Sequence, residues 1–339
     1  MHACLVPLLE TLRGGTLECM HYGAVAVCDA QGKVVAQAGD PHWVTFPRSA
    51  IKPFQALPFV QSGGPRQLGF TPSNLALMCA SHSGEPMHVA QVDDMLGKAG
   101  VGYKQLQCGC HVPFFADLGL EHRPAPGSFD ERNHNCSGKH TGFLAYCKLH
   151  GLPTETYLEP AHPLQQAIRD TMARVTGMRP EDLRMGTDGC SAPAFAMPLS
   201  ALARGYARFA SGAGDSEFGE SFVALGDAMT GHPDLVSGTG RLDQDLMRAG
   251  KGDWISKAGA DGVQVVASRS RRQAVAVKVI DGSKQAVSAA AVHALDQLGW
   301  LDEAQRQALW AWRAASILSI RRDEQVGERL AVFALRPPH

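Results

Sequence analysis

The sequence predicts a mixed α+β fold, because segments with strand spacing and segments with helical spacing occur in separate blocks along the chain. Strand patterns lie near both ends, at 15–38 and 262–282, and helical patterns dominate between them. The first and last strands are therefore candidates for a common sheet. With 339 residues, 45% of them apolar, the chain is long enough for one large domain or two moderate ones.

Apolar spacing and turn residues place the individual elements. In residues 15–38, β-branched runs flank "DAQG", which is typical of a hairpin turn. Residues 262–282 likewise predict two strands joined by a basic turn. Helices are expected to begin near Ser49 and to occupy the following segments: 73–81 as a helix or turn, 85–100, 140–153, 162–177, 192–210 and 288–300.

The charge balance gives no reason to expect nucleic acid or an anionic membrane as a partner. Lys and Arg total 32, Asp and Glu total 33, and the net charge is −1. Apolar runs such as "QAVAVKVI" are too short to span a bilayer. The N-terminal stretch "MHACLVPLLETLRGG" lacks a basic region followed by a long apolar core, so no signal peptide is expected.

The cysteine pattern favours reduced thiols. All nine cysteines lie within the first 190 residues, and an odd number without a signal peptide is typical of a cytoplasmic protein. We therefore expect a cytoplasmic location and no disulfide framework.

The stretch "FPRSAIKP", residues 46–53, contains a serine and a lysine that can share a helix face. Ser49 and Lys52 are three positions apart. Inside a helix, Pro53 would clash with the carbonyl of Ser49, so Ser49 is expected to cap or open the helix. Free N–H groups there would stabilise an oxyanion, and a desolvated lysine can act as a base. The spacing alone leaves open a plain N-cap serine beside a surface lysine.

A second serine and a second lysine follow in an order that loosely matches known serine enzymes. "MCASHSGEP" places Ser81 at a turn that either presents a hydroxyl to a cleft or only ends a helix. "WISKAGADGVQVV" places Lys257 before small residues that permit a close approach, although a solvated loop lysine is also compatible. Penicillin-binding proteins and serine β-lactamases use S-x-x-K, S-x-N and K-T-G in this order.

Cysteine, lysine and histidine gather in short tracts that could include metal ligands. Thiolate and imidazole groups suit zinc, but no C-x-x-C pair is present, and buried free thiols are an open alternative. The tracts are "NHNCSGKHTG" with Cys136, Lys139 and His140, "GTDGCSAP" with Asp188 and Cys190, and "QCGCH" with Cys108, Cys110 and His111.

Taken together, these stretches resemble the Rhizobium-type L-asparaginases, the asparaginase II family, over about residues 5 to 335. The resemblance implies a single catalytic domain over 1–339 and a fold similar to serine β-lactamases and penicillin-binding proteins, with an antiparallel sheet and a helical region. It implies a homodimer that hydrolyses L-asparagine to L-aspartate and ammonia. The segments that resemble the family are "RGGTLECMHYGAVAV", "FPRSAIKPFQALP", "CASHSGEP", "NHNCSGKHTGFLAYC", "EPAHPLQQAI", "GTDGCSAPAFAMPLSALARGYARF" and "KAGADGVQVVA".

The resemblance also implies roles for individual residues. It implies two Ser-Lys tandems, Ser49 with Lys52 and Ser81 with Lys257, and a zinc ion held by Cys136, Lys139 and Cys190. The lysine would have to bind zinc as a neutral amine. The "QCGCH" tract is not part of this zinc set.

Three residues beside the tandems and the zinc set are candidate substrate-binding groups. Asp188 is expected to hold the substrate ammonium, and Arg48 or His140 to orient polar groups. A role for Asp188 in bracing the turn before Cys190 is left open.

Two other functions remain as alternatives. The first is another serine amidohydrolase or a peptidase of the penicillin-binding class. The second is a non-catalytic, zinc-stabilised protein that binds an amino acid. Ammonia release from L-asparagine would separate the second alternative from an enzyme.

Overall fold

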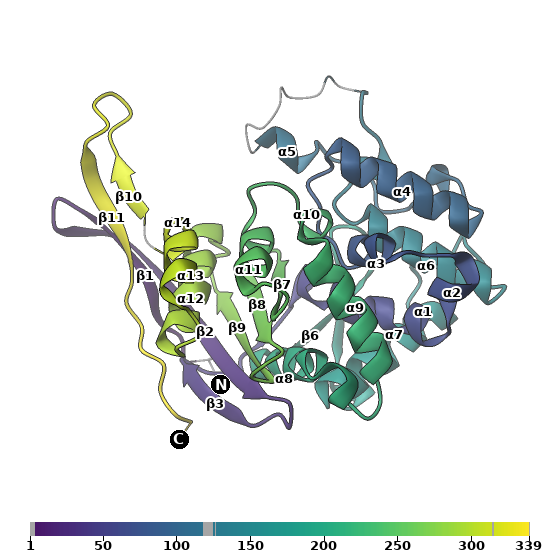
Figure 1. Ribbon diagram of the computed structural model, residues 1–339, viewed down its shortest axis with the longest axis horizontal. Coiled ribbons are helices and arrows are strands. Elements are labelled where there is room, and N and C mark those ends of the chain that lie inside the picture. The colour runs from purple at the N-terminus through teal and green to yellow at the C-terminus, as the bar shows by residue number, and fades with distance from the viewer. Residues whose placement is uncertain (1–3, 118–124, 126, 314, 339) are drawn as a thin grey trace. The chain divides into compact units, whose positions relative to one another are not determined.

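The computed structural model describes residues 4–117, 125, 127–313 and 315–338, and its chain divides into two compact units (Figure 1). Unit 1 is formed by residues 1–50, 197–210 and 249–339, and unit 2 by residues 51–196 and 211–248. Each unit is therefore assembled from segments that are distant in sequence. The single catalytic domain over 1–339 stays a prediction.

Unit 1 is built on an antiparallel sheet that joins strands from both ends of the chain, as the sequence predicts. The order is β10-β11-β1-β2-β9-β8-β7, and β3 pairs with β2. The strands are β1 (Val6–Arg13), β2 (Thr16–Asp29), β3 (Val34–Ala38), β7 (Trp254–Gly259), β8 (Val263–Ser268), β9 (Gln273–Val279), β10 (Ala315–Leu318) and β11 (Gln325–Ala331).

The long strand β2 organises this sheet. Along one edge it pairs first with β1 and then with β3, and along the other it pairs with β9 from Gly23 onward. The turn from β2 to β3 lies at "DAQG", where the Asp29 carboxylate accepts hydrogen bonds from the N–H groups of Gln31 and Lys33. Both predicted hairpins, β2–β3 and β8–β9, are confirmed.

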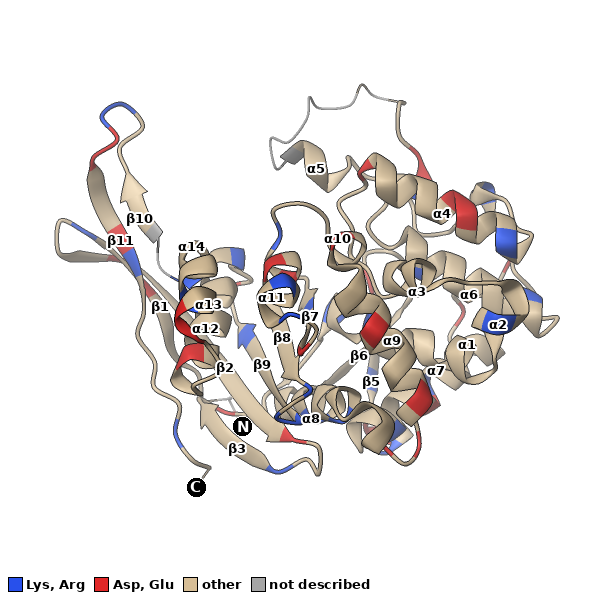
Figure 2. Cartoon of the chain, in the orientation of Figure 1, with Lys and Arg blue, Asp and Glu red and all other residues tan. Residues whose placement is uncertain are grey.

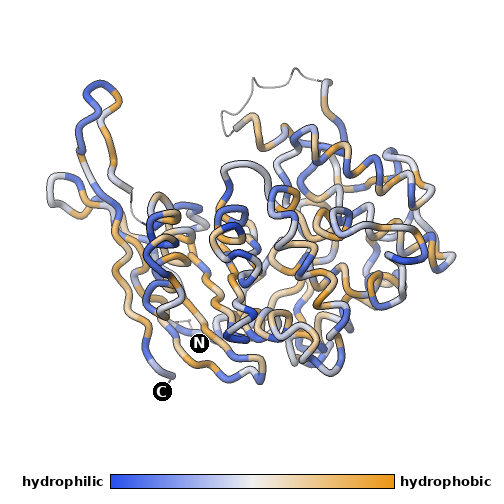
Figure 3. The backbone as a smooth tube through the Cα atoms, viewed as in Figure 1, coloured by the Kyte–Doolittle hydropathy of each residue, from blue (hydrophilic) through white to orange (hydrophobic). Residues whose placement is uncertain are grey.

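Helices cover both faces of the sheet. Helix α8 (Leu199–Ala210) packs on β2, β8 and β9, and α12 (Lys284–Gln297) packs on β1, β8, β9 and β11. All residues of β8 and nearly all of β9 are buried, which requires cover on both sides. In Figure 3 the sheet strands carry hydrophobic colour, whereas the tip of the β10–β11 hairpin is hydrophilic. The remaining described elements of unit 1 are β4 (Val44–Thr45), α13 (Glu303–Ala308) and α14 (Trp310–Arg313).

Unit 2 is mainly helical. Helix α6 lies against α1, α3 and α4, and α1 also packs on α7. The described helices are α1 (Lys52–Gln61), α2 (Gly64–Leu68), α3 (Pro72–Met78), α4 (Pro86–Ala99), α5 (Phe114–Asp117), α6 (Ser137–Leu149), α7 (Pro163–Thr176), α9 (Gly219–Gly231), α10 (Pro233–Val236) and α11 (Leu242–Gly250), the last of which ends in unit 1. Short 3-10 turns are η2 (Tyr103–Gln105), η3 (Glu131–Asn133), η4 (Pro180–Asp182) and η5 (Gly212–Gly214).

Charged residues of both signs occur in both units. Figure 2 shows acidic and basic residues interspersed along the chain in both units. No helix in the described part of the chain is long and apolar enough to cross a bilayer.

The helix predicted over residues 192–210 is only half correct. Its second half is α8, but residues 193–198 form strand β6 (Pro193–Pro198), which pairs with β5 (Arg184–Thr187). Pro198 disfavours helical backbone at the residue before it, and β5 supplies the hydrogen-bond partners of an extended chain. The alanine-rich spacing could not reveal that partner.

The predicted helix start at Ser49 is confirmed, with a difference in detail. A 3-10 turn, η1 (Arg48–Ile51), contains Ser49 and runs directly into α1. Pro53 occupies the first turn of α1, where its missing N–H costs nothing. Ser49 therefore opens the helical segment but does not cap α1, whose N-cap position is Ile51.

The contact between α3 and α6 depends on a glycine, which gives a test of the packing in unit 2. A Cβ atom added to Gly138 would lie 2.3 Å from the Leu77 carbonyl oxygen. We expect Gly138→Ala to force the helices apart and lower the free energy of unfolding by roughly 1–3 kcal/mol, measured by urea denaturation.

The matched control is Gly97→Ala in α4, where an added Cβ meets nothing within 4 Å. It should be neutral or stabilising by up to about 1 kcal/mol, because alanine is the better helix former. Equal stability of the Gly138→Ala variant and the wild type would contradict the close-packing argument.

Candidate active site

Ser81 lies on a buried turn that backbone and side-chain hydrogen bonds hold in place. Helix α3 ends at Met78, and the chain then turns so that the Ser81 N–H donates to the Val236 carbonyl at 2.9 Å. The Ser81 carbonyl accepts a hydrogen bond from Nη1 of Arg241 at 3.2 Å. Only 5% of Ser81 is exposed. The turn predicted at Ser81 is thus confirmed, and hydrogen bonds to its N–H and its carbonyl hold it in place.

Lys52 points its amine at this turn. Its Nζ donates to the Ser81 hydroxyl at 3.0 Å and to the carbonyls of Ala80 and Asn135 at 2.5 and 3.2 Å. The residue is 1% exposed, and burial lowers the pKa of its amine. Within unit 2, the partner hydroxyl of Lys52 is therefore that of Ser81, a contact that the helical spacing of Ser49 and Lys52 did not suggest.

His82 fixes the same turn from the other side. Its Nδ1 accepts from the Gly84 N–H at 3.1 Å, and burial lowers its pKa, so the ring is neutral with its proton on Nε2. That Nε2 then donates to the Ser137 hydroxyl at 2.9 Å, and Ser137 donates to the Arg132 carbonyl at 2.8 Å. This chain ties the serine turn to the first residue of α6.

Two cysteines and a lysine predicted to be zinc ligands meet in unit 2. Cys136 precedes α6, Lys139 lies in its first turn, and Cys190 lies on the turn between β5 and β6. Lys139 Nζ is 3.0 Å from Cys190 Sγ, and the Cys136 side chain hydrogen bonds to the Cys190 sulfur. All three residues are buried. The structure thus brings together groups that are 54 positions apart at most.

The protonation states of this cluster follow from its contacts. The hydrogen bond with Cys136 lowers the pKa of the Cys190 thiol and raises that of Cys136, so Cys190 is the thiolate of the pair. Burial alone would lower the pKa of Lys139, but the sulfurs of Cys190 and Cys136 outweigh it and raise that pKa overall. Without a metal, an ammonium therefore faces a thiolate.

His140, the next residue of α6, faces the same sulfur. Its Nδ1 is hydrogen-bonded to the Tyr157 hydroxyl at 2.7 Å. Its Nε2 is buried without a hydrogen-bond partner of good geometry, although it lies close enough to Cys190 to lower the pKa of that thiol. Burial lowers the pKa of His140 to about 4, so the ring is neutral and one nitrogen carries a lone pair.

This donor set fits a transition metal in part. Two cysteine sulfurs and an amine suit zinc, and the unpartnered His140 Nε2 marks a polar space beside them. In the described part of the chain, no cluster of three or more His, Cys, Asp or Glu side chains is arranged to hold a metal ion. A zinc ion here would therefore depend on Lys139 as well as on Cys136 and Cys190.

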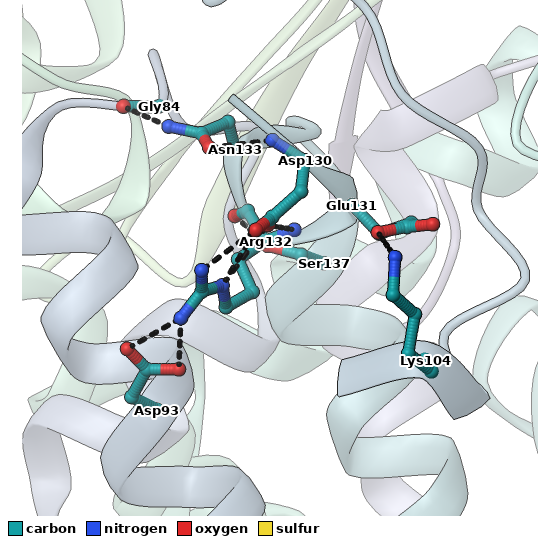
Figure 4. Close-up of polar contacts among 8 residues, drawn as sticks. All are labelled: Gly84, Asp93, Lys104, Asp130, Glu131, Arg132, Asn133 and Ser137. Atoms are coloured by element: carbon teal, nitrogen blue, oxygen red, sulfur yellow. Dashed lines mark hydrogen bonds and ion pairs between the residues drawn. The ribbon is translucent and has the colours of Figure 1, made fainter. Parts of the chain in front are cut away.

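A polar cluster below the serine turn fixes the loop that leads to Cys136 (Figure 4). The Arg132 guanidinium contacts the carboxylates of Asp130 and Asp93 at 2.6–3.1 Å. Asn133 donates to the Gly84 carbonyl at 3.1 Å, on the turn that follows Ser81. The loop before α6 and the serine turn are thus joined by the Asn133 side chain as well as by His82.

Unit 1 contains Ser49 and Arg48 in a constrained backbone. Arg48 has a φ of 53°, which is unusual for a residue other than glycine, and its guanidinium pairs with the Asp261 carboxylate. This ion pair gives Arg48 a structural partner. Its proposed role in orienting substrate stays a prediction.

Close approach also fixes the strand that bears Lys257 against the segment before Ser49. A Cβ atom added to Gly259 would lie 2.1 Å from the Pro47 carbonyl oxygen, so only glycine fits there. Lys257 is fully buried on β7, and its Nζ donates to the Ala258 carbonyl at 2.8 Å. Unit 1 therefore holds Ser49 and Lys257 on neighbouring segments.

Asp188 lies on the turn that presents Cys190. Its carboxylate accepts from the Gly189 N–H at 2.7 Å, and its backbone carbonyl accepts from the Ser191 N–H at 2.8 Å. These bonds favour the bracing role that the sequence left open. Binding of a substrate ammonium by Asp188 stays a prediction.

Three residues that contact the site were not found from the sequence: His82, Asn135 and Arg241. His82 and Asn135 are adjacent to residues that were singled out, so adjacency was the available signal. Arg241 follows the glycine-containing stretch "SGTG", 160 positions after Ser81, and no spacing rule joins the two.

A surface hollow of about 670 Å³ between α1 and α7 contains none of the candidate residues.

The Asp130 carboxylate gives a pH-dependent test of the loop before α6. Hydrogen bonds from Arg132 lower the pKa of Asp130 from its usual 3.8, so the ionised form stabilises the fold above that pH and the stabilisation is lost as pH falls through the lower folded pKa. We expect Asp130→Asn to lower the melting temperature at neutral pH. The difference from wild type should shrink as the pH falls below 3.8 and through the lowered pKa of the folded state.

The control is Asp170→Asn on α7, an exposed residue outside this cluster. It should change the melting temperature little at either pH. A difference for Asp130→Asn that stays constant down to acid pH would show that the carboxylate charge is not what stabilises the loop.

Comparison with known proteins shows which family the chain belongs to. A β-lactamase from Mycobacterium bovis is 14% identical, with a TM-score of 0.41, over 81% of this chain and 94% of that one, a likeness too distant to carry an argument. Comparison with curated protein sequences gives no match. The family model described as L-asparaginase II matches residues 9–330. The resemblance seen in the motifs is thereby confirmed, and the chain belongs to the L-asparaginase II family, whose members are amidohydrolases that act on a small-molecule substrate.

Proposed function

We propose that the protein hydrolyses L-asparagine to L-aspartate and ammonia by serine-lysine chemistry. One observation carries the proposal: in a chain of the L-asparaginase II family, a buried lysine amine contacts a buried serine hydroxyl beside a cysteine-lysine cluster. Lysines are rarely buried without a functional reason, because burial disfavours their charged form. Lys52 has this environment.

In this mechanism the reaction is a double displacement. Ser49 attacks the side-chain amide carbon as its proton passes to Lys52, and a covalent acyl-enzyme forms. The C–N bond breaks, and the leaving nitrogen takes a proton relayed by Ser81 and Lys257 to depart as ammonia. Water then adds to the acyl carbon, releases L-aspartate and restores the serine. The roles of Ser49 and Lys257 rest on the sequence resemblance. The roles of Lys52 and Ser81 rest on the resemblance and also on the contact between the two side chains.

A zinc ion is part of the proposal. Cys136, Lys139 and Cys190 would hold it, with Lys139 as the neutral amine. A bound zinc supplies positive charge that attracts a carboxylate and shapes the site. Binding would require the cluster to lose the proton that Lys139 carries beside the Cys190 thiolate.

The proposed state of the protein is a cytoplasmic homodimer. The homodimer follows from the sequence resemblance alone. All nine cysteines are free thiols in the structure, which supports a reducing location.

The nucleophile can be tested by removing one oxygen atom. Ser49→Ala should lower the rate of ammonia release from L-asparagine by roughly a thousandfold or more while leaving the melting temperature unchanged. L-glutamine, measured in parallel, defines the preference of the wild type between the two amides.

The control is Ser62→Ala at the end of α1, a partly exposed serine whose hydroxyl donates to the Phe59 carbonyl. It should retain wild-type turnover. Substantial ammonia release by Ser49→Ala would remove Ser49 as the nucleophile. A wild type loaded with zinc that releases no ammonia from either amide would overturn the proposed function.

The zinc ligands can be tested without an activity assay. Wild-type protein loaded with zinc and dialysed should retain about one ion per chain by elemental analysis, and Cys136→Ser or Cys190→Ser should retain far less. Cys110→Ser, in the exposed part of the other cysteine tract, is the matched control and should retain the ion. Loss of zinc from Cys110→Ser, or retention by both cluster variants, would assign the metal elsewhere.

A further inference from the structure

Arg241 is a charged residue next to the serine turn that none of the proposed steps uses. It lies between α10 and α11, and its Nη1 donates to the Ser81 carbonyl at 3.2 Å. Its guanidinium carbon lies 5.8 Å from the centre of the Phe114 ring. The side chain thus extends from its own loop to the backbone of a proposed catalytic residue.

Arg241 forms no ion pair within the described part of the chain. Burial lowers the pKa of its guanidinium, and the charges of Asp243 and Glu85 offset this only in part. Glu85 is engaged with Thr239, whose N–H and hydroxyl both donate to it at 3.0 Å. A carboxylate of a ligand could therefore form the direct ion pair with Arg241 that these two residues do not form.

The Arg241 side chain is largely surrounded by protein but keeps some exposure to solvent. Burial lowers the pKa of Arg241, although the residue as a whole is partly exposed. Nη1 is engaged with the Ser81 carbonyl, and the other N–H groups of the guanidinium remain as donors for a ligand that approaches this partly exposed residue.

A closed series of contacts links Arg241 to Lys52. Asn135 accepts from Lys52 with its carbonyl, and its N–H donates to His111 Nε2 at 3.3 Å. His111 stacks on Phe114, with ring centres 4.6 Å apart, and Phe114 lies beneath the guanidinium. The series closes because Lys52 and Arg241 both donate to Ser81, one to its hydroxyl and one to its carbonyl. The Lys52 amine and the Arg241 guanidinium thus contact the same residue, Ser81.

We propose that Arg241 binds the α-carboxylate of the amino-acid substrate. This inference rests on the proposed function and names how that site selects its substrate. A guanidinium presents N–H donors in a planar fork that matches a carboxylate, and such a pair is strongest where water is partly excluded. In L-asparagine only the Cα and Cβ atoms separate the α-carboxylate from the side-chain amide. A carboxylate on Arg241 therefore keeps the amide next to Ser81 and Lys52.

The proposal predicts different effects of an Arg241 substitution on two substrates that differ only at the α-carboxylate. L-asparaginamide carries a neutral amide in that position and keeps the side-chain amide, so it can be hydrolysed but not paired with Arg241. We expect Arg241→Gln to raise the KM for L-asparagine at least about tenfold, with a smaller change in kcat. Its KM for L-asparaginamide should stay within about twofold of wild type.

Two further variants distinguish carboxylate binding from a structural role. Arg241→Lys retains the charge and should recover part of the affinity for L-asparagine, although a lysine lacks the fork. Arg179→Gln, which alters an exposed arginine paired with Asp182, should leave both substrates unaffected. If Arg241→Gln weakens both substrates equally, Arg241 only positions Ser81 and the proposal is overturned.

A binding measurement keeps the test independent of catalysis. Calorimetric titration of the Ser49→Ala variant with L-asparagine and L-asparaginamide should show tighter binding of L-asparagine, and the added Arg241→Gln change should remove that preference. Absence of any preference in Ser49→Ala would overturn the role of Arg241 even if the wild type is an asparaginase. Preference without ammonia release by the wild type would leave Arg241 as a carboxylate site and overturn the proposed function instead.

Discussion

The burial of the Lys52 amine is the constraint on which the described site depends. A lysine at 1% exposure needs acceptors for its donors, and it finds them in the carbonyls of Ala80 and Asn135 and the hydroxyl of Ser81. These acceptors come from the end of α3 and from the loop before α6. Any shift of either segment would leave the amine unsatisfied, so the lysine and the two backbones determine one another.

Close packing makes this arrangement rigid. Gly138 lets α6 approach the Leu77 carbonyl at the end of α3, and the chain from His82 through Ser137 to Arg132 fixes the turn against the same helix. In unit 1, Gly259 allows the equivalent approach of β7 to Pro47. Catalytic groups must be held in a fixed geometry. Glycine at the points of contact permits the close packing that fixes them.

Local rules predicted much of the fold but little of the contact pattern. The hairpins, the proline-opened helices and the sheet shared by both chain ends follow from spacing and turn residues, which act within a few positions. The strand at 193–198 was missed because its formation depends on β5, which alanine-rich spacing cannot show. Lys52 was paired with Ser49 by helical geometry, whereas the structure adds Ser81 from 29 positions away. Arg241 depends on a contact across 160 positions, beyond the reach of any spacing argument.

The charges within unit 2 constrain what the site can accept. The ammonium of Lys139 is balanced by the Cys190 thiolate, so that pair contributes little net charge. The Lys52 amine donates to two carbonyls and to the Ser81 hydroxyl, and the Arg241 guanidinium donates to the Ser81 carbonyl. An amine and a guanidinium therefore lie on either side of Ser81, one at its hydroxyl and one at its carbonyl. In the binding mode that we propose, the α-carboxylate of the substrate pairs with Arg241 while its side-chain amide lies beside Ser81.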